Sequence, residues 1–562
     1  MIRVLSTNIT SPLGFDTEQN YQAVKAGKSA LCPYMGWKGI PEEFTASLFS
    51  EKQMAELQVE GYTRFESIVI RSISDALGQT DIDVRSTRTL FVLSTTKGDI
   101  EELADVPEND GRYFSPGASA KRIAGYFGMT TDPIVVCNAC ISGTTAQILA
   151  SRLMETALYD NAIVCGADCQ SPFVVAGFMS FKSLSPEECR PFDIERLGLN
   201  LGDAAATVIL TYSKRKAEGW KLLKGTLDND AYHVSAPSPS GEGTYGVIMK
   251  TLEGFDKDRL ALVSVHGTAT MFNDQMESKA VERAGLSDIP ACALKGYYGH
   301  TLGAAGVLES IMTMRALDDG LILPTRGFSE IGVSGKISIT DRELQTDRTS
   351  FLKIISGFGG CNGALLYSKE ETHDHESCGP VEHKTLHCVR IRPDSIEVDG
   401  EKLETETSGK QILTEAYRKY GIDYPKFYKM DVFSRIVFLA AELMAMKEPI
   451  GDEDTAVIIF NRSSSIVADR KHIATYSKPE EFYPSPSVFL YTLPNISIGE
   501  VAIRHGFKGE TSLYILNERN DELISAVINA AFACSDAETI MTGWADCTDE
   551  DTFEAEIILT TK

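Results

Sequence analysis

The sequence predicts a layered α/β fold, and three observations lead to this expectation. Apolar runs of strand length alternate with helical patterns, which indicates buried sheets covered by helices. The 562 residues are too many for one ordinary hydrophobic core and favour about three or four core-sized units. Motifs of the first third of the chain return in the last third, so we expect the units to be repeats.

The expected strands are short apolar runs that end beside glycines or small polar residues. They are RTLFVLSTT (88–96), DPIVVCNA (132–139), NAIVCGAD (161–168), AATVILTY (205–212), ALVSVHGT (261–268) and FLKIISGFGG (351–360). Residues 368–384, SKEETHDHESCGPVEHK, are polar and charged, which is typical of a linker. Within it, we expect His373, His375 and Cys378 to be solvated rather than to bind a metal ion.

Beyond this linker the chain repeats motifs of its beginning. The matching segments are VFSRIVFLAAELM (432–444) with RFESIVIRSISDAL (64–77), TAVIIFNRSS (455–464) with TLFVLSTTKG (89–98), and ADC (545–547) with ADC (167–169). A shift of 378 residues also places Gly128 on Gly506. Because the matches keep their order, we interpret residues 385–562 as a degenerate copy of about residues 1–213 that lacks about 29 residues. A general likeness between strand-helix-strand segments is the alternative.

The charge balance excludes some classes of partner. The chain has 54 basic and 79 acidic residues, a net charge of -25, so we expect no broad positive surface for nucleic acid. An acidic carrier protein would need a local basic patch. Acidic stretches such as DCTDEDTFEAE (546–556) are expected to form a solvated face.

Features of membrane and secreted proteins are missing from the sequence pattern. No apolar run reaches the ~18 residues of a membrane span, and the first residues do not resemble a signal peptide. The 12 cysteines are therefore expected to be reduced thiols, and we expect a cytoplasmic protein.

The first candidate for chemistry is Cys140, which follows an apolar strand and precedes a helical pattern. Backbone N–H groups and the positive end of the helix at such a turn favour a thiolate, and Gly143 permits close approach. This is a suitable place for a nucleophile, although a buried structural thiol is the alternative. We do not expect Cys137 and Cys140 to bind a metal ion, because no second CxxC motif or nearby His completes four ligands.

Two histidines follow further apolar strands. His266 lies in VSVHGTATMFND together with Thr268 and Thr270, and His300 lies in LKGYYGHTLGAAG. Loops with small residues at strand ends are where the site of an α/β protein is expected. The glycine-rich run ISGFGGCNGALL (355–366) matches no phosphate-binding fingerprint, and we expect it to bring the backbone close to a ligand beside Phe358.

Together these motifs resemble the β-ketoacyl synthases of the thiolase superfamily. The resemblance covers about residues 1–367 in order, through SPLG (11–14), CNACISG (137–143), RPFD (190–193), DAYH (230–233), SGEG (240–243), HGTATMFND (266–274), KGYYGHTLGAAGVLE (295–309) and GFGGCN (357–362). It implies a thiolase-like duplicated α/β/α/β/α layered fold with mixed five-stranded sheets. Residues 1–213 would carry the nucleophile, residues 214–367 the histidines, and residues 385–562 would add a third, degenerate thiolase-like half.

The resemblance also implies the chemistry of a 3-oxoacyl-acyl-carrier-protein synthase, an acyltransferase. Cys140 would be the nucleophile, and His266 and His300 would complete a Cys-His-His site of the elongating type. Lys295 and Glu309 match the family's supporting ion pair. An acyl group would move to Cys140 and then undergo decarboxylative Claisen condensation with a malonyl-carrier thioester, in fatty acid or polyketide elongation.

Further positions match groups that bind the substrate. The resemblance implies that Thr268 and Thr270 contact the phosphopantetheine arm, and that Phe358 is the gate of the acyl pocket and part of the oxyanion site. Two positions depart from the family pattern. Asp203 stands where a Glu is common, which concerns the geometry of its loop, and Ser356 replaces an aromatic residue of the pocket lining.

The implied partner is an acyl carrier protein, and the resemblance implies no metal ion or redox cofactor. The copy places Glu518 at the position of Cys140 and has no counterpart of His266 or His300, so we expect it to be non-catalytic. It would form a pseudo-dimer with the first half, with a homodimer as the alternative. Two other functions remain open: a non-catalytic chain-length-factor-like partner, which would normally lack Cys140, and a thiolase-like acyltransferase or decarboxylase without condensation.

Overall fold

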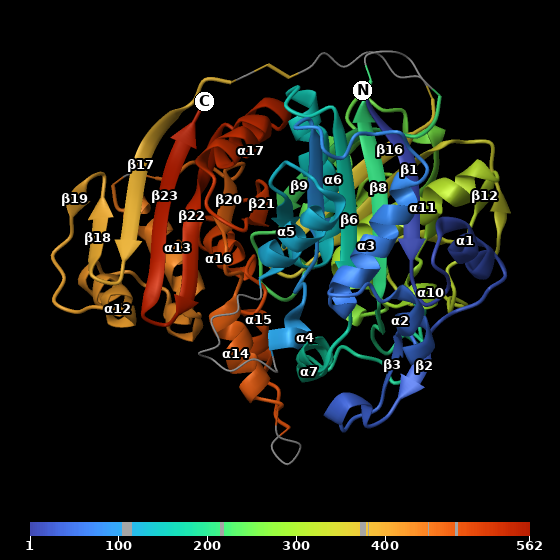
Figure 1. Cartoon of the computed structure of the whole chain (residues 1–562), viewed down its shortest axis with the longest axis horizontal. Coiled ribbons are helices and arrows are strands. Elements are labelled where there is room, and N and C mark those ends of the chain that lie inside the picture. The colour runs from blue at the N-terminus through green and yellow to red at the C-terminus, as the bar shows by residue number, and fades with distance from the viewer. Residues whose placement is uncertain (104–114, 214–217, 371–377, 380, 448, 478–481) are drawn as a thin grey trace.

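The computed structural model of the chain describes residues 1–103, 115–213, 218–370, 378–379, 381–447, 449–477 and 482–562. Three sheets follow one another across the molecule, with helices between and outside them (Figure 1). We call residues 1–213 the first unit, 214–367 the second unit and 385–562 the third unit. The expected α/β class is confirmed, and His373 and His375 of the linker lie outside the described residues.

The sheet of the first unit has five strands of mixed direction. Their order is β5 (Ile134–Val136), β4 (Thr89–Ser94), β6 (Asn161–Asp168), β8 (Ala204–Tyr212) and β1 (Ile2–Thr10). The strands β5, β4 and β6 are parallel, and β8 runs antiparallel to both of its neighbours. Every residue of β4 is buried, as expected for a strand that is covered on both faces.

The second unit repeats this arrangement. The order is β11 (Pro290–Cys292), β10 (Leu260–Ser264), β15 (Ser350–Ser356), β16 (Cys361–Ser368) and β9 (Lys221–Asn229). The first three strands are parallel and β16 is antiparallel to both neighbours. The short strand β13 (Ser338–Ile339) extends the sheet beside β11.

Two buried helices fill the space between these sheets. Both α6 (Ser142–Glu155) and α11 (Ala305–Asp318) contact strands of the first and the second sheet. The helices α3 (Arg64–Leu77) and α8 (Glu242–Thr251) contact the first and second sheets, respectively, from the outer sides. The layers therefore alternate as α/β/α/β/α, as the family resemblance implied.

The close approach of the two central helices depends on glycines. A Cβ atom on Gly143 would lie 2.8 Å from the carbonyl oxygen of Gly303, and one on Gly306 would lie 2.6 Å from the backbone nitrogen of Thr144. Larger residues would push the helix starts apart. The residues just before α6 and just before α11 are thereby brought together.

The third unit has the same strand order and directions as the first. The order is β21 (Thr511–Ile515), β20 (Ala456–Asn461), β22 (Thr539–Asp549), β23 (Thr552–Thr561) and β17 (Lys384–Arg392), followed by β18 (Ser395–Val398) and β19 (Glu401–Lys402). Its helices include α13 (Val432–Ala445), α14 (Ile466–Ala474), α15 (Pro486–Leu490), α16 (Ile496–His505) and α17 (Asp521–Cys534). Common descent of the first and third units stays a prediction, now with matching topology.

Equivalent residues of the first and third units have the same backbone conformation or make the same hydrogen bonds. Gly128 and Gly506 each end a helix in the left-handed conformation, with φ of 68° and 73°. Asp168 accepts a hydrogen bond from the backbone nitrogen of Thr96, 3.1 Å away, and Asp546 accepts one from that of Ser463, 2.8 Å away. The expectation of a solvated acidic face at residues 546–556 is therefore wrong at its start, because the fold buries Asp546 to bind the loop after β20.

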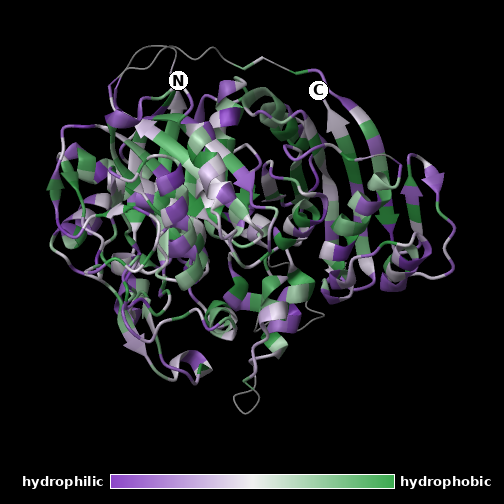
Figure 2. Ribbon diagram, turned by 180° about the vertical axis from the view of Figure 1, so that it is seen from behind, coloured by the Kyte–Doolittle hydropathy of each residue, from purple (hydrophilic) through white to green (hydrophobic). Residues whose placement is uncertain are grey.

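The units are joined into one body by strand pairing. Tyr514 of β21 pairs antiparallel with Val136 of β5, and Ile2 of β1 pairs with Leu222 of β9. The sheets follow in the order third, first, second, and apolar residues concentrate on their strands and on the inner helices (Figure 2). Among the residues that the structure describes, none of the helices combines the length and the apolarity needed to traverse a bilayer.

Candidate active site

Cys140 lies at the turn where the first sheet passes into the central helix layer. β5 ends at Val136, a 3-10 turn η2 covers Ala139–Ile141, and α6 begins at Ser142. Ala139 has a left-handed φ of 47°, a strained backbone of the kind that often occurs at functional sites. Cys140 itself is 9% exposed.

The third unit supports this turn, which the sequence did not predict. The backbone nitrogen of Leu513 donates to Asn138 Oδ1 (2.8 Å), and Asn138 Nδ2 donates to the carbonyl oxygen of Thr511 (3.0 Å). The backbone nitrogen of Cys137 donates to the carbonyl oxygen of Leu513 (3.1 Å). β21 thus holds the residues that directly precede the candidate nucleophile.

The resting state of Cys140 differs from our expectation of a thiolate. Burial raises the pKa of the Cys140 thiol to about 12, although the Lys295 ammonium acts in the opposite direction. The local helix start and the nearby cation do not offset the loss of water around the sulfur. The thiol is therefore protonated at neutral pH.

His266 and His300 meet Cys140 in space. The Cys140 Sγ and one ring nitrogen of each histidine lie within 4.8 Å of one another. The two rings are 5.1 Å apart between centroids and are inclined by 79°. His300 precedes α11 and Cys140 precedes α6, so the glycine contact between these helices brings them together.

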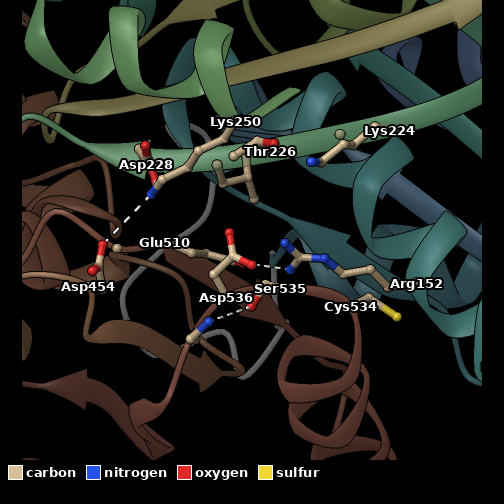
Figure 3. A pocket seen from close by; sticks show the side chains of 14 residues that line it. Arg152, Lys224, Thr226, Asp228, Lys250, Asp454, Glu510, Cys534, Ser535 and Asp536 are labelled. Atoms are coloured by element: carbon tan, nitrogen blue, oxygen red, sulfur yellow. Dashed lines mark hydrogen bonds and ion pairs between the residues drawn. The ribbon is translucent and has the colours of Figure 1, made fainter. Parts of the chain in front are cut away.

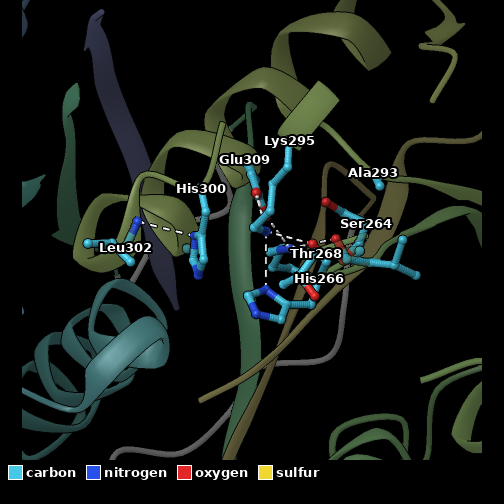
Figure 4. Close-up of polar contacts among 12 residues, drawn as sticks. Ser264, His266, Thr268, Ala293, Lys295, His300, Leu302 and Glu309 are labelled. Atoms are coloured by element: carbon cyan, nitrogen blue, oxygen red, sulfur yellow. Dashed lines mark hydrogen bonds and ion pairs between the residues drawn. The ribbon is translucent and has the colours of Figure 1, made fainter. Parts of the chain in front are cut away.

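Hydrogen bonds orient both imidazoles (Figure 4). His300 Nδ1 accepts a hydrogen bond from the backbone nitrogen of Leu302 (3.2 Å), which leaves the proton on Nε2. His300 Nε2 is buried and has no hydrogen-bond partner among the described residues. His266 Nδ1 lies 3.1 Å from Lys295 Nζ, which can only donate, so its Nε2 also carries the proton.

Both histidines are neutral. Burial lowers the pKa of His266 and of His300 well below the ordinary value, and the Lys295 ammonium lowers each further. Neutral imidazoles with protonated Nε2 atoms are hydrogen-bond donors, rather than bases, toward a ligand in the site.

Lys295 and Glu309 form the ion pair that the family resemblance implied, with an Nζ–Oε1 distance of 2.8 Å. Lys353 is a third member that our sequence analysis missed, and its Nζ lies 2.5 Å from Glu309 Oε2. Although burial acts to raise it, the two ammonium groups lower the pKa of Glu309. A lysine inside the apolar strand FLKIIS was the available signal, since a buried lysine needs an anionic partner.

Two further carboxylates hold the loop that carries His266. Glu277 Oε1 accepts from the backbone nitrogen of His266 (2.5 Å), and its Oε2 accepts from that of Gly267 (2.9 Å). Asp274 Oδ1 accepts from the backbone nitrogen of Thr268 (3.1 Å). Thr270 Oγ1 lies 2.8 Å from Thr268 Oγ1 at the same loop. The predicted threonines are thus fixed beside the histidine.

These groups line a cavity of about 350 Å³. Cys140, both histidines, both threonines and Phe358 all contribute to its wall, together with Ser356. Such a volume is ordinary for a small-ligand site. The structure therefore brings all the predicted site residues together, with Lys295 and Glu309 directly behind His266.

A smaller cavity of about 20 Å³ lies between Cys140 and Phe358 on one side and the third unit on the other. Phe489 and Leu493 of the third unit line it. Asn495 Nδ2 donates to the carbonyl oxygen of Phe358 (2.8 Å), so the third unit also anchors the expected gate. No motif in the sequence pointed to this contribution, because the contact joins residues far apart in the chain.

The two departures from the family pattern leave the cavity intact. Asp203 is fully buried, pairs with Arg64 and accepts from the backbone nitrogens of Gln170 (2.6 Å) and Phe49 (3.0 Å). Ser356 Oγ donates to Asn362 Oδ1 (2.7 Å). Asp203 therefore fixes its surroundings through hydrogen bonds to the backbone, although it departs from the family pattern.

His266 and His300 are far from Cys140 in the sequence but lie beside it in the structure. Thiol and imidazoles together form a donor set that a thiophilic ion such as Zn²⁺ prefers. Among the described residues the other such group is Glu155, Cys378 and Cys534.

Comparison with known proteins identifies the family. The N-terminal domain of β-ketoacyl synthases matches residues 4–216, and their C-terminal domain matches residues 222–329. The 3-oxoacyl-[acyl-carrier-protein] synthase 2 of Vibrio harveyi is 30% identical over 288 residues, which cover 47% of this chain and 69% of that protein. The protein of the same name from Vibrio cholerae is 26% identical over 415 residues, or 65% of this chain and 98% of the relative.

Solved structures share the fold. A β-ketoacyl synthase from Burkholderia phymatum covers 66% of this chain and 99% of its own, with a TM-score of 0.61 and 22% identity. A structure described as PfaC keto synthase-chain length factor covers 100% of this chain and 78% of its own, with a TM-score of 0.79 and 14% identity. With both family domains matched, the chain belongs to the β-ketoacyl synthase family, whose relatives named here are 3-oxoacyl-[acyl-carrier-protein] synthases, a class of acyltransferase.

Proposed function

We propose that this protein transfers an acyl group to Cys140 and then joins it to a malonyl unit by decarboxylative Claisen condensation. The observation that carries the proposal is the meeting of the Cys140 Sγ with ring nitrogens of His266 and His300, within 4.8 Å, in one buried cavity. The substrates would be acyl and malonyl thioesters of an acyl carrier protein. Thr268 and Thr270 would contact the phosphopantetheine arm.

In the first step the Cys140 sulfur attacks the carbonyl carbon of the acyl thioester. The new C–S bond forms, the bond to the carrier sulfur breaks, and the thiol proton leaves with the carrier thiol. Backbone N–H groups of Cys140 and Phe358 would bind the oxyanion. A protonated resting thiol suits this order of events, since the proton is released only when a thioester occupies the cavity.

In the second step the malonyl thioester loses carbon dioxide, and negative charge develops on its thioester oxygen. The Nε2–H groups of His266 and His300 would donate to that oxygen, because both imidazoles are neutral and their Nδ1 atoms are engaged elsewhere. The resulting carbanion attacks the acyl carbonyl, the C–C bond forms, and the bond to Cys140 breaks. The Cys140 thiolate that is released takes one proton from solvent, which replaces the proton lost in the first step.

The third unit would act as a built-in partner of the catalytic units. Its strand β21 extends the first sheet through β5, and it anchors both Asn138 and Phe358. The likeness in fold to a keto synthase-chain length factor over the whole chain supports this proposal. The alternative of a purely non-catalytic partner is disfavoured, because Cys140 and both histidines are present in one cavity.

Intact mass after incubation with acyl carriers tests the proposed chemistry. We expect an adduct equal to the acyl group, absent in Cys140→Ala and retained in Cys361→Ser, whose thiol lines the same cavity. Addition of malonyl carrier should then remove the adduct and release a 3-oxoacyl product. An adduct that persists in Cys140→Ala, or a wild-type protein that stays unmodified with every carrier tested, would contradict the proposal.

A separate experiment tests the partner role. A chain that ends near Tyr367 should be insoluble or newly dimeric in light scattering, because the β5 edge and the apolar surface beneath the third unit become open. A soluble, active monomer of that length would refute the built-in partner while leaving the catalytic proposal untouched.

A further inference from the structure

Three acidic or thiol side chains meet where the third unit adjoins the central helices. Glu155 is the last residue of α6, Cys534 is the last residue of α17, and Cys378 belongs to the connection between β16 and β17. One carboxylate oxygen of Glu155 and the Sγ atoms of Cys378 and Cys534 lie within 4.8 Å of one another. All three side chains are partly buried, so the expectation that Cys378 is simply solvated is wrong, because the end of α6 and the end of α17 pack beside it. Segments that are far apart in the sequence thus present three ligating atoms to one point.

A buried ion pair and a small cavity lie beside this cluster. Arg152, one turn before Glu155 on α6, pairs with Glu510 of the third unit at 2.5 Å, and both side chains are less than 10% exposed. A cavity of about 100 Å³ lies beside them, and Cys534 is part of its wall (Figure 3). A buried ion pair between the first and third units therefore lies next to the cluster.

The three ligating atoms of this cluster carry the same sign of charge whenever they are ionised. Two thiolates and a carboxylate within 4.8 Å of one another would repel each other. A bound divalent cation reverses this relationship, because it deprotonates coordinating thiols and attracts the carboxylate.

We propose that Glu155, Cys378 and Cys534 form a zinc site that fastens the connection after β16 and the end of α17 to the end of α6. Two thiolates and one carboxylate are ligands that Zn²⁺ accepts in tetrahedral geometry, with solvent in the fourth position. Binding would release the two thiol protons. His373 and His375 lie outside the described residues and form no part of the proposed site.

This site is separate from the active site and does not depend on the proposed reaction. Cys140 precedes the first residue of α6 and Glu155 is its last, so a helix of 14 residues, about 21 Å long, separates them. The proposed role is structural, and we expect zinc to raise the thermal stability of the protein. Loss of any one ligand should remove that dependence.

Cobalt binding to the full-length protein tests the proposal. The Cys140→Ala background is used so that the Cys-His-His set cannot bind the probe through its thiolate. After chelation and reduction, Co²⁺ should bind with one ion per chain and show a thiolate-to-cobalt charge-transfer band, and Zn²⁺ should displace it. Loss of an outer-shell partner typically lowers metal affinity by about 10–100-fold. Cys378→Ser and Cys534→Ser each remove a ligand itself, so each should lower the cobalt affinity by at least that factor.

A matched control uses Cys388→Ser, which removes another partly buried thiol, on β17, outside the cluster. It should leave the band and the zinc-dependent melting temperature unchanged. The proposal is overturned if the parent shows no thiolate band, or if the band survives both Cys378→Ser and Cys534→Ser. It is also overturned if the untreated protein has lost two hydrogens by mass, with the loss absent in Cys534→Ser, because the thiols then form a disulfide.

Discussion

The first and third units share a strand order and yet differ at the turn that carries the proposed nucleophile. In the first unit a buried 3-10 turn carries Cys140 from β5 into α6. In the third unit the corresponding position between β21 and α17 is Glu518, which is exposed. The sheet and its helices are therefore compatible with both outcomes, and the reactive group depends on a few residues of the connecting loop.

The second difference concerns what covers the turn. In the first unit residues 169–203 connect β6 to β8 and include α7 (Pro172–Ser180), whose Phe178 lines the cavity. In the third unit β22 and β23 are joined by a short turn, and no covering segment remains. Among the residues that the structure describes, the cavity that contains Cys140 lies over the first unit, beneath this segment, where water can be excluded as the proposed reaction needs. The third unit has retained the surface that packs against its neighbour.

The comparison predicts that only the first unit is chemically active. Cys140→Ala should reduce condensation to background, because the sulfur is the proposed point of covalent attachment. Glu518→Ala, the same change at the equivalent position of the third unit, should leave the rate unchanged. The 3-oxoacyl product, measured by mass spectrometry, is the readout, and a comparable loss in both variants would abolish the distinction.

The histidines should separate the two proposed steps. His266→Ala and His300→Ala should each slow carbon dioxide release by about 10²–10³-fold, since each removes one donor to the developing oxyanion. Acylation of Cys140 should persist in both variants. Labelled carbon dioxide from malonyl carrier measures the first effect and intact mass the second, and unchanged release in both variants contradicts the assignment.

The interface between the first and third units should depend on its buried charge pair. Glu510→Gln leaves the Arg152 guanidinium, which cannot lose its proton, buried without an anion, and should cost about 3–5 kcal/mol in the free energy of unfolding. Asp521→Asn breaks the exposed pair with Arg519 and should cost below about 1 kcal/mol. Urea unfolding measures both, and equal small losses would show that the pair does not hold the units together.

The pH dependence of alkylation should reveal the protonated resting thiol. Because burial raises the pKa of Cys140 to about 12, its thiolate fraction is small at neutral pH and rises with pH. Iodoacetamide should modify Cys140 about tenfold faster per pH unit from about pH 7 to 9. A rate that levels off below about pH 9 would show a thiolate stabilised at the helix start, as the sequence alone suggested.

The smallest expected effect tests the contribution of the third unit to the acyl cavity. Phe489→Ala should enlarge the cavity beside Cys140 and favour longer acyl chains by up to about fourfold for each methylene newly accommodated, or about 0.8 kcal/mol. Tyr483→Ala, which removes an exposed aromatic side chain of the same unit, is the control. Acylation rates over a series of chain lengths are the measurement, and an unchanged preference would exclude Phe489 from the pocket.

The local features of this protein could be predicted from the order of its amino acids. Alternating apolar runs and helical patterns predicted the α/β layers, and a constant shift matched Gly128 with Gly506 at helix ends of the same conformation. Cys140 was recognisable at a strand-to-helix turn. These features depend on periodicity and on short-range backbone geometry, which are written along the chain.

The interactions between these parts could not be predicted in this way, because they depend on how the three units pack. The tertiary structure placed Lys353 on Glu309, brought Leu513 to Asn138 and Phe489 to the cavity, and buried Cys140 deeply enough to keep its thiol protonated. Such properties depend on distances between residues far apart in the chain and on how much water the packing excludes. Neither quantity is periodic in the sequence, because both arise only when the three units are packed into one body.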